Sequence, residues 1–242
     1  MPAPLRYLDG ISSEKSDVAM GNFPYLNPTD WRVWYEDWTV YDLAQTDTPE
    51  WTLTETSISD CDTIVTPGTL VLTMADAGDD AQLQLDHGHF YLTSGKKAIY
   101  ETRIKINKGS GGTIGEQGFV VGMAAVDTGN TFITSPPPSA LLVDDFWGFL
   151  SYDGTTNIIA WQGEADVAST EVGCATYADD TWMKLSIYYD GAKSTFYKDD
   201  VEVAQISTNE PSSVITPVLF IGSGEAFATT LSCDYIFFAN ER

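Results

Sequence analysis

Short runs of strand-forming residues, separated by turn residues, recur from Trp31 to the end of the chain. In Tyr100–Ile106 the apolar residues alternate with polar ones, which predicts a strand with one face on a core and the other in water. No amphipathic helix of about ten or more residues is evident. Strands are predicted at 31–42, 51–56, 69–73, 81–85, 98–107, 118–126, 139–152, 158–161, 182–189, 193–198, 202–206, 217–221 and 231–239. So many strands joined by short turns predict an all-β fold, a sandwich or a barrel.

The turns between these strands have the expected composition. Asp153-Gly154 and Asp190-Gly191 are dipeptides that favour tight hairpins between strand formers. Within Lys184–Ile206 the order is strand, Asp-Gly turn, strand, a second turn at Lys198-Asp199-Asp200, and a third strand. Two looser stretches, 108–117 and 128–139, are rich in Gly, Ser or Pro and predict long surface loops.

Residues 1–30 differ from the rest and predict an extended N-terminal arm, followed by a β-sandwich domain over 31–242. Prolines and glycines punctuate the arm, and neither a helical nor a strand period persists in it. Apolar residues on an extended segment need a surface to cover them, which is either this domain or a neighbouring chain. The apolar group of the arm consists of Phe23, Pro24, Tyr25 and Leu26.

Aromatic residues are dense at the start of the domain, where Trp31, Trp34 and Trp38 are interleaved with Tyr35 and Tyr41. Three interpretations are open. The rings pack in the core and at strand edges, they form a protein interface, where Trp and Tyr are enriched, or they form a platform for sugars.

The charge of the chain is strongly negative, with 35 acidic residues against 12 basic ones and a net charge of -23. Such a field repels nucleic acids and anionic membranes, so neither is expected as a partner. The N-terminus lacks the apolar run of a signal peptide, and no segment approaches the roughly eighteen apolar residues of a membrane span. We therefore expect a protein that is made in the cytoplasm and is not exported by the general secretory route.

The three cysteines, Cys61, Cys174 and Cys233, are widely spaced, and none belongs to a Cys-x-x-Cys pair. This pattern argues against a zinc or redox site. It favours free buried thiols in a reducing compartment, while one disulfide plus one free thiol stays open.

Residues with catalytic or metal-binding chemistry do not form a convincing site. Adjacent carboxylates at Glu36-Asp37 and Asp144-Asp145 point to opposite faces of a strand, whereas glycan cleavage needs two carboxylates that face each other. His87 and His89 have a spacing that suits a metal, but no third ligand can be named. The sequence therefore predicts no enzyme, no cofactor and no metal.

The strand pattern resembles the concanavalin A-like, or laminin G-like, jelly roll. The resemblance rests on Tyr100–Ile106 and on Trp182–Gly191 followed by Phe196–Ala204, where a strand, Asp-Gly, strand order is typical. The second turn, Asp199-Asp200, departs from the usual Asp-Gly. This resemblance covers residues 31–240 and implies a fold only, because the same fold occurs in lectins, glycanases and structural modules.

Both ends of the chain resemble the head decoration, or cement, proteins of tailed bacteriophages. The resembling segments are Leu8–Ile11, Met20–Pro24, Pro28-Thr29, Tyr35–Trp38 and Cys233–Arg242. The resemblance implies a protein of the capsid exterior, made in the host cytoplasm, that docks on the major capsid protein without catalysis.

These observations together lead to the hypothesis of a capsid decoration protein that forms a homotrimer or homodimer. Its contacts with capsid protein or with sister subunits are expected at Phe23, Pro24, Tyr25, Leu26, Trp31 and Trp34. The alternative is a carbohydrate-binding module for host attachment. It requires an exposed aromatic patch, expected around Asp144–Trp147 and Trp161, although no specific sugar-binding residue can be assigned.

Overall fold

The computed structural model describes residues 29–38, 51–55, 61–66, 68–86, 90–126, 145–152, 154–164 and 168–242, with 61–66 and 168–169 as backbone only. Some of the predicted features lie outside these residues. They are the arm with Phe23, Pro24, Tyr25 and Leu26, the His87 and His89 pair, and Asp144.

The described part of the chain is an all-β structure, and it contains no helix with the length and apolar character needed to cross a membrane. The strands are β1 (Trp31–Glu36), β2 (Trp51–Glu55), β3 (Cys61–Thr66), β4 (Thr69–Met74), β5 (Asp80–Leu85), β6 (Ala98–Asn107), β7 (Gln117–Ala124), β8 (Phe146–Ser151), β9 (Asn157–Glu164), β10 (Ala168–Thr176), β11 (Met183–Tyr189), β12 (Ser194–Lys198), β13 (Val201–Ile206), β14 (Thr216–Ser223) and β15 (Thr229–Glu241).

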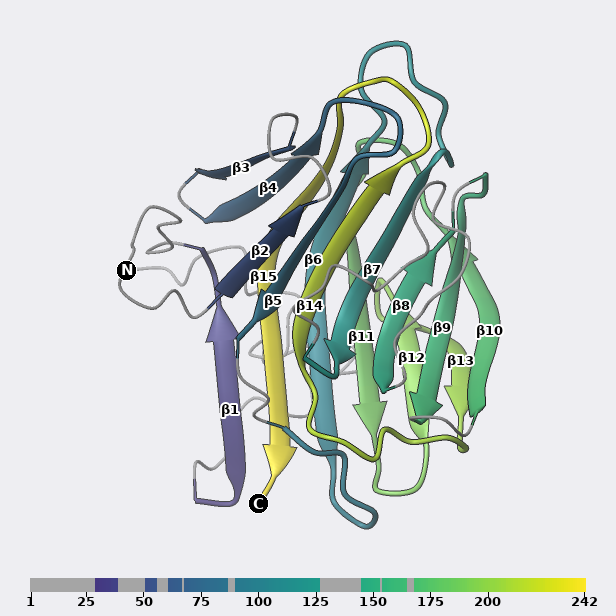
Figure 1. The fold of residues 1–242 in the computed structure, drawn as a ribbon. Coiled ribbons are helices and arrows are strands. Elements are labelled where there is room, and N and C mark those ends of the chain that lie inside the picture. Colours follow the sequence, from purple (N-terminus) through teal and green to yellow (C-terminus); the bar gives the residue numbers. More distant parts are fainter. Residues whose placement is uncertain are drawn as a thin grey trace, which may run out of the picture.

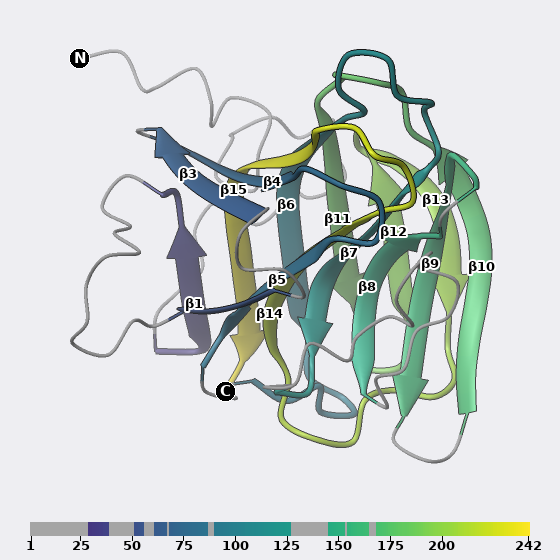
Figure 2. The ribbon, with the colours of Figure 1, turned by 45° about the horizontal axis from the view of Figure 1, so that its top comes forward.

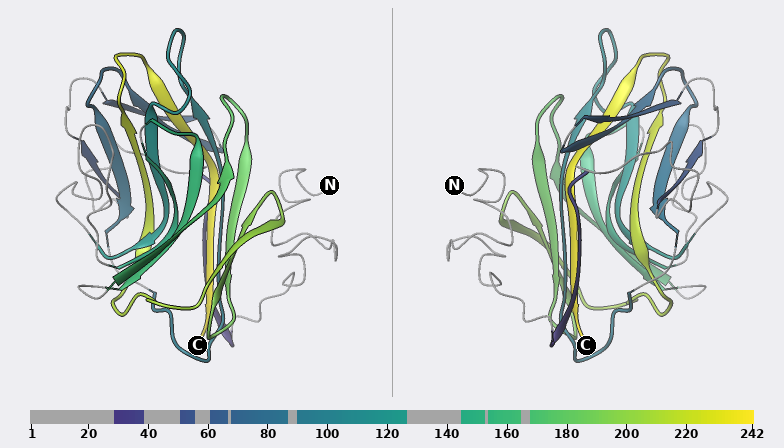
Figure 3. Two further views of the ribbon diagram at one scale, coloured as in Figure 1. Left: turned by 90° about the vertical axis from the view of Figure 1, so that its right-hand side faces the viewer. Right: turned by 90° about the vertical axis from the view of Figure 1, so that its left-hand side faces the viewer.

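Two antiparallel sheets lie face to face as the two layers of a sandwich (Figures 1 and 3). Sheet A has the order β13-β12-β11-β6-β15-β4-β3, and β1 also pairs with β15. Sheet B has the order β10-β9-β8-β7-β14-β5-β2. Neighbours in both sheets are often distant in sequence, because the chain crosses between the layers as it does in a jelly roll.

Apolar side chains from the inner faces of both sheets form the main core. Phe149 of sheet B and Phe196 of sheet A meet edge to face, with their ring centroids 5.3 Å apart. Trp147 of β8 and Phe238 of β15 meet in the same way at 6.3 Å. Burial of such rings stabilises the sandwich, since each removes a large apolar area from water.

Strand β15 has two partners along the same edge. Its first half, from Thr229 to Cys233, pairs with β4, and its second half, from Ile236 to Glu241, pairs with β1. A bulge between Cys233 and Tyr235 separates the two halves against β6. Figure 2 shows the result, in which β1 and the β3–β4 hairpin leave β15 in different directions.

The predicted strands are largely confirmed, and two are missing from the prediction. The first is β3, and the second is β10, whose residues Ala168–Thr176 are mostly small or polar and so give no clear apolar alternation. The alternation predicted for β6 is confirmed in its second half, where Ile104 and Ile106 are buried and Arg103 is partly exposed. In its first half the expectation of a wet outer face is wrong, because Glu101 is also buried.

Candidate functional site

An aromatic strip runs along the outer face of sheet A at β1. It consists of Trp31, Val33 and Tyr35 of β1 and Phe237 of β15. Alternate residues of a strand point to one face, so the three β1 side chains share this face. Val33 and Tyr35 are 45% and 39% exposed, although both lie on an ordered strand. The strip is therefore the candidate for contact with a partner.

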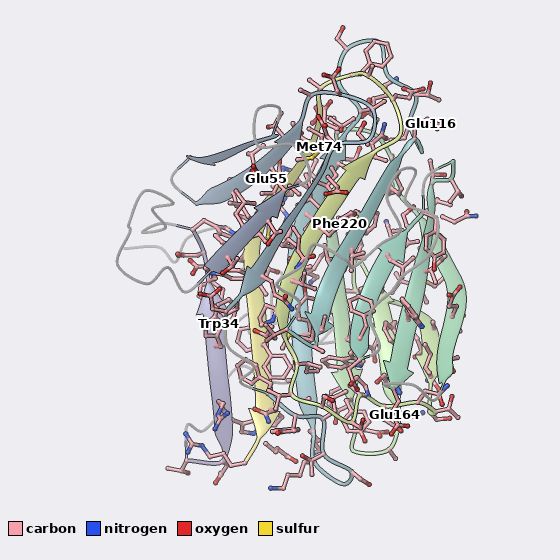
Figure 4. All side chains as sticks on the ribbon, in the orientation of Figure 1. Trp34, Glu55, Met74, Glu116, Glu164 and Phe220 are labelled. Carbon is pink, nitrogen blue, oxygen red and sulfur yellow. The ribbon has the colours of Figure 1, made fainter. Side chains whose placement is uncertain are left out.

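The opposite face of β1 is anchored by tryptophans. The ring centroid of Trp34 lies 5.5 Å from that of Trp51 on β2, and the ring of Trp38 lies 5.3 Å from the same Trp51. Figure 4 shows Trp34 where β1 approaches the start of β2. The three tryptophans of the sequence cluster thus separate, because Trp31 lies on the strip whereas Trp34 and Trp38 pack toward the core.

Glu36 has a structural position at the end of β1. Its Oε1 accepts a hydrogen bond of 2.9 Å from the backbone N–H of Trp38. Trp38 has a φ of 58°, a left-handed conformation that is uncommon for a bulky residue and that this hydrogen bond and the buried ring hold in place. The carboxylate is therefore engaged in turn formation.

A buried polar cluster lies beside the strip on the same face of sheet A, since Phe237 pairs with Glu101 and Glu101 pairs with Ser186. Tyr235 stacks on Tyr35, with ring centroids 6.1 Å apart, and its hydroxyl donates a 2.5 Å hydrogen bond to Oε1 of Glu101. The Oγ of Ser186 donates to the other oxygen of the same carboxylate at 3.2 Å. Burial, followed by the charge of Glu101, raises the pKa of Tyr235 well above its usual value, so this phenol stays neutral and remains a donor.

The outer face of sheet B is apolar in its centre. A second hydrophobic cluster lies there and includes Phe220 of β14, which is labelled in Figure 4. Its buried members are Val120, Ala124, Phe146, Leu150, Trp161, Val218 and Phe220. Within the described strands, the outward positions of β7, β8 and β14 carry no carboxylate.

Two acidic residues of the described sheet B strands do point outward, Asp80 on β5 and Glu171 on β10. Five strand spacings separate them, or about 24 Å at the usual distance between strands. Glycosidases place their two carboxyl groups about 5–10 Å apart. In the described part of this face, the acids are thus too far apart to act as such a pair.

The expectation of an exposed aromatic patch for sugar binding is wrong for Trp147 and Trp161. Trp147 is fully buried and its Nε1 donates a 2.8 Å hydrogen bond to Ser194, while Trp161 is 5% exposed and stacks near Phe146 at 5.7 Å. Asp145 is also buried, and its Oδ1 accepts hydrogen bonds from the backbone N–H groups of Ser212 and Ser213. Residues of β8 and β9 are buried on both faces of sheet B. The sequence could not show this burial, because it depends on contacts with segments that are distant in the chain.

The cysteine prediction is confirmed in part. Cys174 and Cys233 are free thiols, and burial raises their pKa values to about 11 and about 12. Cys233 is fully buried, whereas Cys174 is only partly so. No group of three or more His, Cys, Asp or Glu side chains with metal-binding geometry occurs among the residues that the structure describes.

Comparison with known proteins identifies the fold of the chain but not a sequence family. No family model and no curated protein sequence matches the chain. Many solved structures do. The metal-free carbohydrate recognition domain of Emp46p is 13% identical, with a TM-score of 0.58 over 84% of this chain and 94% of that one. The laminarinase domain from Thermotoga petrophila, an endo-1,3-beta-glucanase, is 16% identical, with a TM-score of 0.57 over 88% of this chain and 99% of that one.

A third structure of similar fold is a protein of unknown function from Shewanella oneidensis, which is 13% identical, with a TM-score of 0.55 over 88% of this chain and 87% of that one. At such identities the likeness shows the fold alone. The predicted concanavalin A-like jelly-roll sandwich is confirmed, and its known members include both binding domains and enzymes.

Proposed function

We propose that the chain is a non-catalytic structural protein of a virion, which decorates the capsid exterior by binding the major capsid protein. The observation that carries this proposal is the aromatic strip, since Val33 and Tyr35 are exposed on a strand that directly follows the predicted arm. Exposed aromatic and aliphatic side chains on an ordered sheet are typical of a contact surface. Arm and strip would then form one continuous contact.

Two further properties support a structural role over catalysis. The outward acids of the described sheet B strands are too distant to cleave a glycoside, as shown above. The excess of 35 acidic over 12 basic residues also suits an outer shell better than a surface that faces packaged DNA. Production in the host cytoplasm and a trimeric or dimeric state belong to the same proposal.

The strip can be tested by adding purified protein to emptied shells and measuring occupancy. We expect the double variant Val33→Ser/Tyr35→Ser to lose about tenfold or more in affinity, because truncating central apolar contacts costs roughly 1–3 kcal/mol. Val201→Ser is the matched control, since Val201 is 65% exposed but lies on β13, at the far edge of sheet A.

The predicted arm needs a separate variant. Deletion of residues 2–28 should also reduce occupancy, since Phe23, Tyr25 and Leu26 would lose their partner surface. Wild-type occupancy by both the strip variant and the deletion would overturn the proposed contact surface.

The second candidate function is carbohydrate binding at a virion surface. It is favoured by the fold likeness to the carbohydrate recognition domains of Emp46p and Emp47p, the latter with a TM-score of 0.56. Because Trp147 and Trp161 are buried, a sugar platform in the described part would need exposed rings such as Tyr35. Glycan-array binding that the Tyr35→Ser variant loses would favour this function, and an array without hits would argue against it.

A further inference from the structure

Basic residues are distributed very unevenly over the sandwich. The seven strands of sheet B contain no Lys or Arg. All ten basic residues of the described ranges lie in strands of sheet A or directly beside them: Arg32, Lys96, Lys97, Arg103, Lys105, Lys108, Lys184, Lys193, Lys198 and Arg242. In a chain with a net charge of -23, this segregation gives the two layers different electrostatic character.

Half of these ten residues meet at one end of sheet A, close to the C-terminus marked in Figure 1. We call this surface the basic rim. Its members are Arg32, Lys96, Lys97, Lys193 and Arg242. They come from four segments, 29–32, 93–97, 190–193 and 240–242, which also contain three acids, Asp30, Asp190 and Glu241. The remainder of the chain has seven basic and 32 acidic residues.

Backbone hydrogen bonds join the four segments into one rigid surface. The N–H of Arg242 donates to the carbonyl of Asp30 at 2.9 Å, and the N–H of Glu241 donates to the carbonyl of Lys97 at 2.9 Å. Segments 93–97 and 190–193 are joined in the same way, since the N–H of Gly95 donates to the carbonyl of Gly191 at 2.7 Å. The backbone of the rim residues therefore keeps fixed relative positions.

The rim lysines also differ from the other lysines in their partners. Elsewhere on sheet A, four of the five other basic side chains form an ion pair with an aspartate, as in Arg103–Asp234 at 3.1 Å and Lys184–Asp200 at 2.6 Å. Lys105–Asp180 and Lys198–Asp199, both at 2.6 Å, follow the same pattern. Among the described residues, no ion pair is formed by Lys96, Lys97, Lys193 or Arg242. Their charge is thus available to a partner.

The opposite end of the sandwich is acidic. Figure 4 shows Glu116 at this end, far from the C-terminus. Hydrogen bonds hold neighbouring acidic loops beside it, since the N–H of Gly224 donates to the carbonyl of Glu116 at 2.8 Å and Glu225 accepts from the N–H of Thr113 at 2.7 Å. The acidic end consists of Asp76, Glu116, Asp179 and Glu225, with Lys108 and the Lys105–Asp180 ion pair beside them.

We propose that the basic rim binds the acidic end of a second copy of this chain, so that copies associate head to tail. Two molecules of charge -23 repel each other over most of their surfaces, whereas the rim brings opposite charges together. A contact between two different patches closes into a ring when the rotation between copies permits it. This inference goes beyond the proposed function and does not depend on it.

The proposal has a distinctive salt dependence. At low ionic strength, of order 0.01 M, the Debye length is about 30 Å, and repulsion between whole molecules opposes association. At about 0.15 M it falls to about 8 Å, which screens that repulsion but leaves close ion pairs in place. At about 1 M the pairs are screened as well. Association is therefore strongest at intermediate salt.

Sedimentation velocity of the full chain at these three salt concentrations tests the proposal. The wild type should associate most at about 0.15 M salt. Lys97→Glu should weaken this association by about tenfold or more, because it places like charge against the acidic end. Lys108→Glu is the control, since it changes the net charge equally but lies at the acidic end, and it should not weaken association. Thermal unfolding checks that both variants fold.

A complementary variant makes the test specific. Asp76→Lys/Glu116→Lys should also weaken association when alone, and mixing it with Lys97→Glu should restore hetero-association, because the reversed charges then face each other. A wild type that sediments as a monomer at every salt concentration would overturn the proposal. Equal weakening by Lys97→Glu and Lys108→Glu would do the same, since net charge rather than the rim would then be responsible.

Discussion

A single residue, Trp51, joins strand β1 to the core. It is 2% exposed, and the rings of both Trp34 and Trp38 pack against it. We expect Trp51→Ala to lower the free energy of unfolding by about 3–5 kcal/mol, since it removes a large buried ring and leaves a cavity. Urea denaturation measures this. The exposed Tyr91→Ala should change the value by no more than about 0.5 kcal/mol, and equal losses would contradict the assigned packing.

The two free thiols give a prediction about pH. With pKa values of about 11 for Cys174 and about 12 for Cys233, both groups are protonated near neutral pH, and only the thiolate reacts with alkylating reagents. Labelling of Cys174, followed by peptide mass spectrometry, should rise about tenfold per pH unit below its pKa. Rapid labelling of both residues in the native protein at about pH 7 would contradict their burial.

The same pKa values affect stability in a defined direction. Because the folded values lie above the ordinary thiol value of 9.0, the folded state retains protons that the unfolded state releases. This contribution is fully present below pH 9 and is lost as the pH rises toward about 12. Unfolding free energies measured across this range should therefore fall, and the Cys233→Ser variant should show a smaller fall.

The roles of single aromatic residues were the least predictable part of the sequence. Trp31, Trp34 and Trp38 lie within eight residues, yet they have different surroundings, because the strand places Trp31 and Trp34 on opposite faces and the turn buries Trp38. The carbohydrate-binding alternative requires Trp147 and Trp161 at the surface, but both side chains are buried in sheet B. The sequence shows where aromatic residues are concentrated. Which of these rings are buried depends on contacts between strands that are distant in the sequence.

The close approach of two strands, β7 and β8, depends on a pair of glycines. Gly122 and Gly148 are direct partners in the ladder, and the ring of Phe146 lies over them. A Cβ at Gly148 would lie 2.4 Å from that ring and 2.5 Å from the carbonyl oxygen of Val121. Only a residue without a side chain fits between backbone and ring.

Gly148→Ala should therefore destabilise the fold by about 1–3 kcal/mol, as overpacking does in other cores. Gly173→Ala on β10 is the matched control, because a Cβ there meets no atom within 4 Å. Its unfolding free energy should stay within about 0.5 kcal/mol of the wild type. Similar losses for both variants in urea titrations would contradict the close approach of the two strands.

Element prediction succeeded where the alternation was clean or the turn chemistry was specific. The hairpins around Asp190-Gly191 and Asp199-Asp200 were located correctly, because turn residues and strand formers are local properties. The prediction missed β10, whose small residues pair with β9 through backbone bonds that any residue can make. The start of β1 was correct, but its described strand ends at Glu36 rather than Asp42.

The whole molecule combines an acidic sandwich with two contact surfaces on one layer, the aromatic strip and the basic rim. Strand β1 contributes to both surfaces, since the strip begins at Trp31 and the rim contains Arg32, whose side chain points to the other face of the strand. The sequence indicated the excess of acidic residues but not the segregation of the basic residues to sheet A, because sheet membership depends on long-range pairing. Both proposals follow from this three-dimensional sorting of residues.

A reconstruction of the virion that contains this chain tests the central claim most directly. The account predicts density for the jelly roll on the outside of the capsid, with β1 and β15 turned toward the major capsid protein and with Val33 and Tyr35 buried in the contact. Density elsewhere in the particle, or a decorating sandwich whose β1 faces solvent, would contradict it.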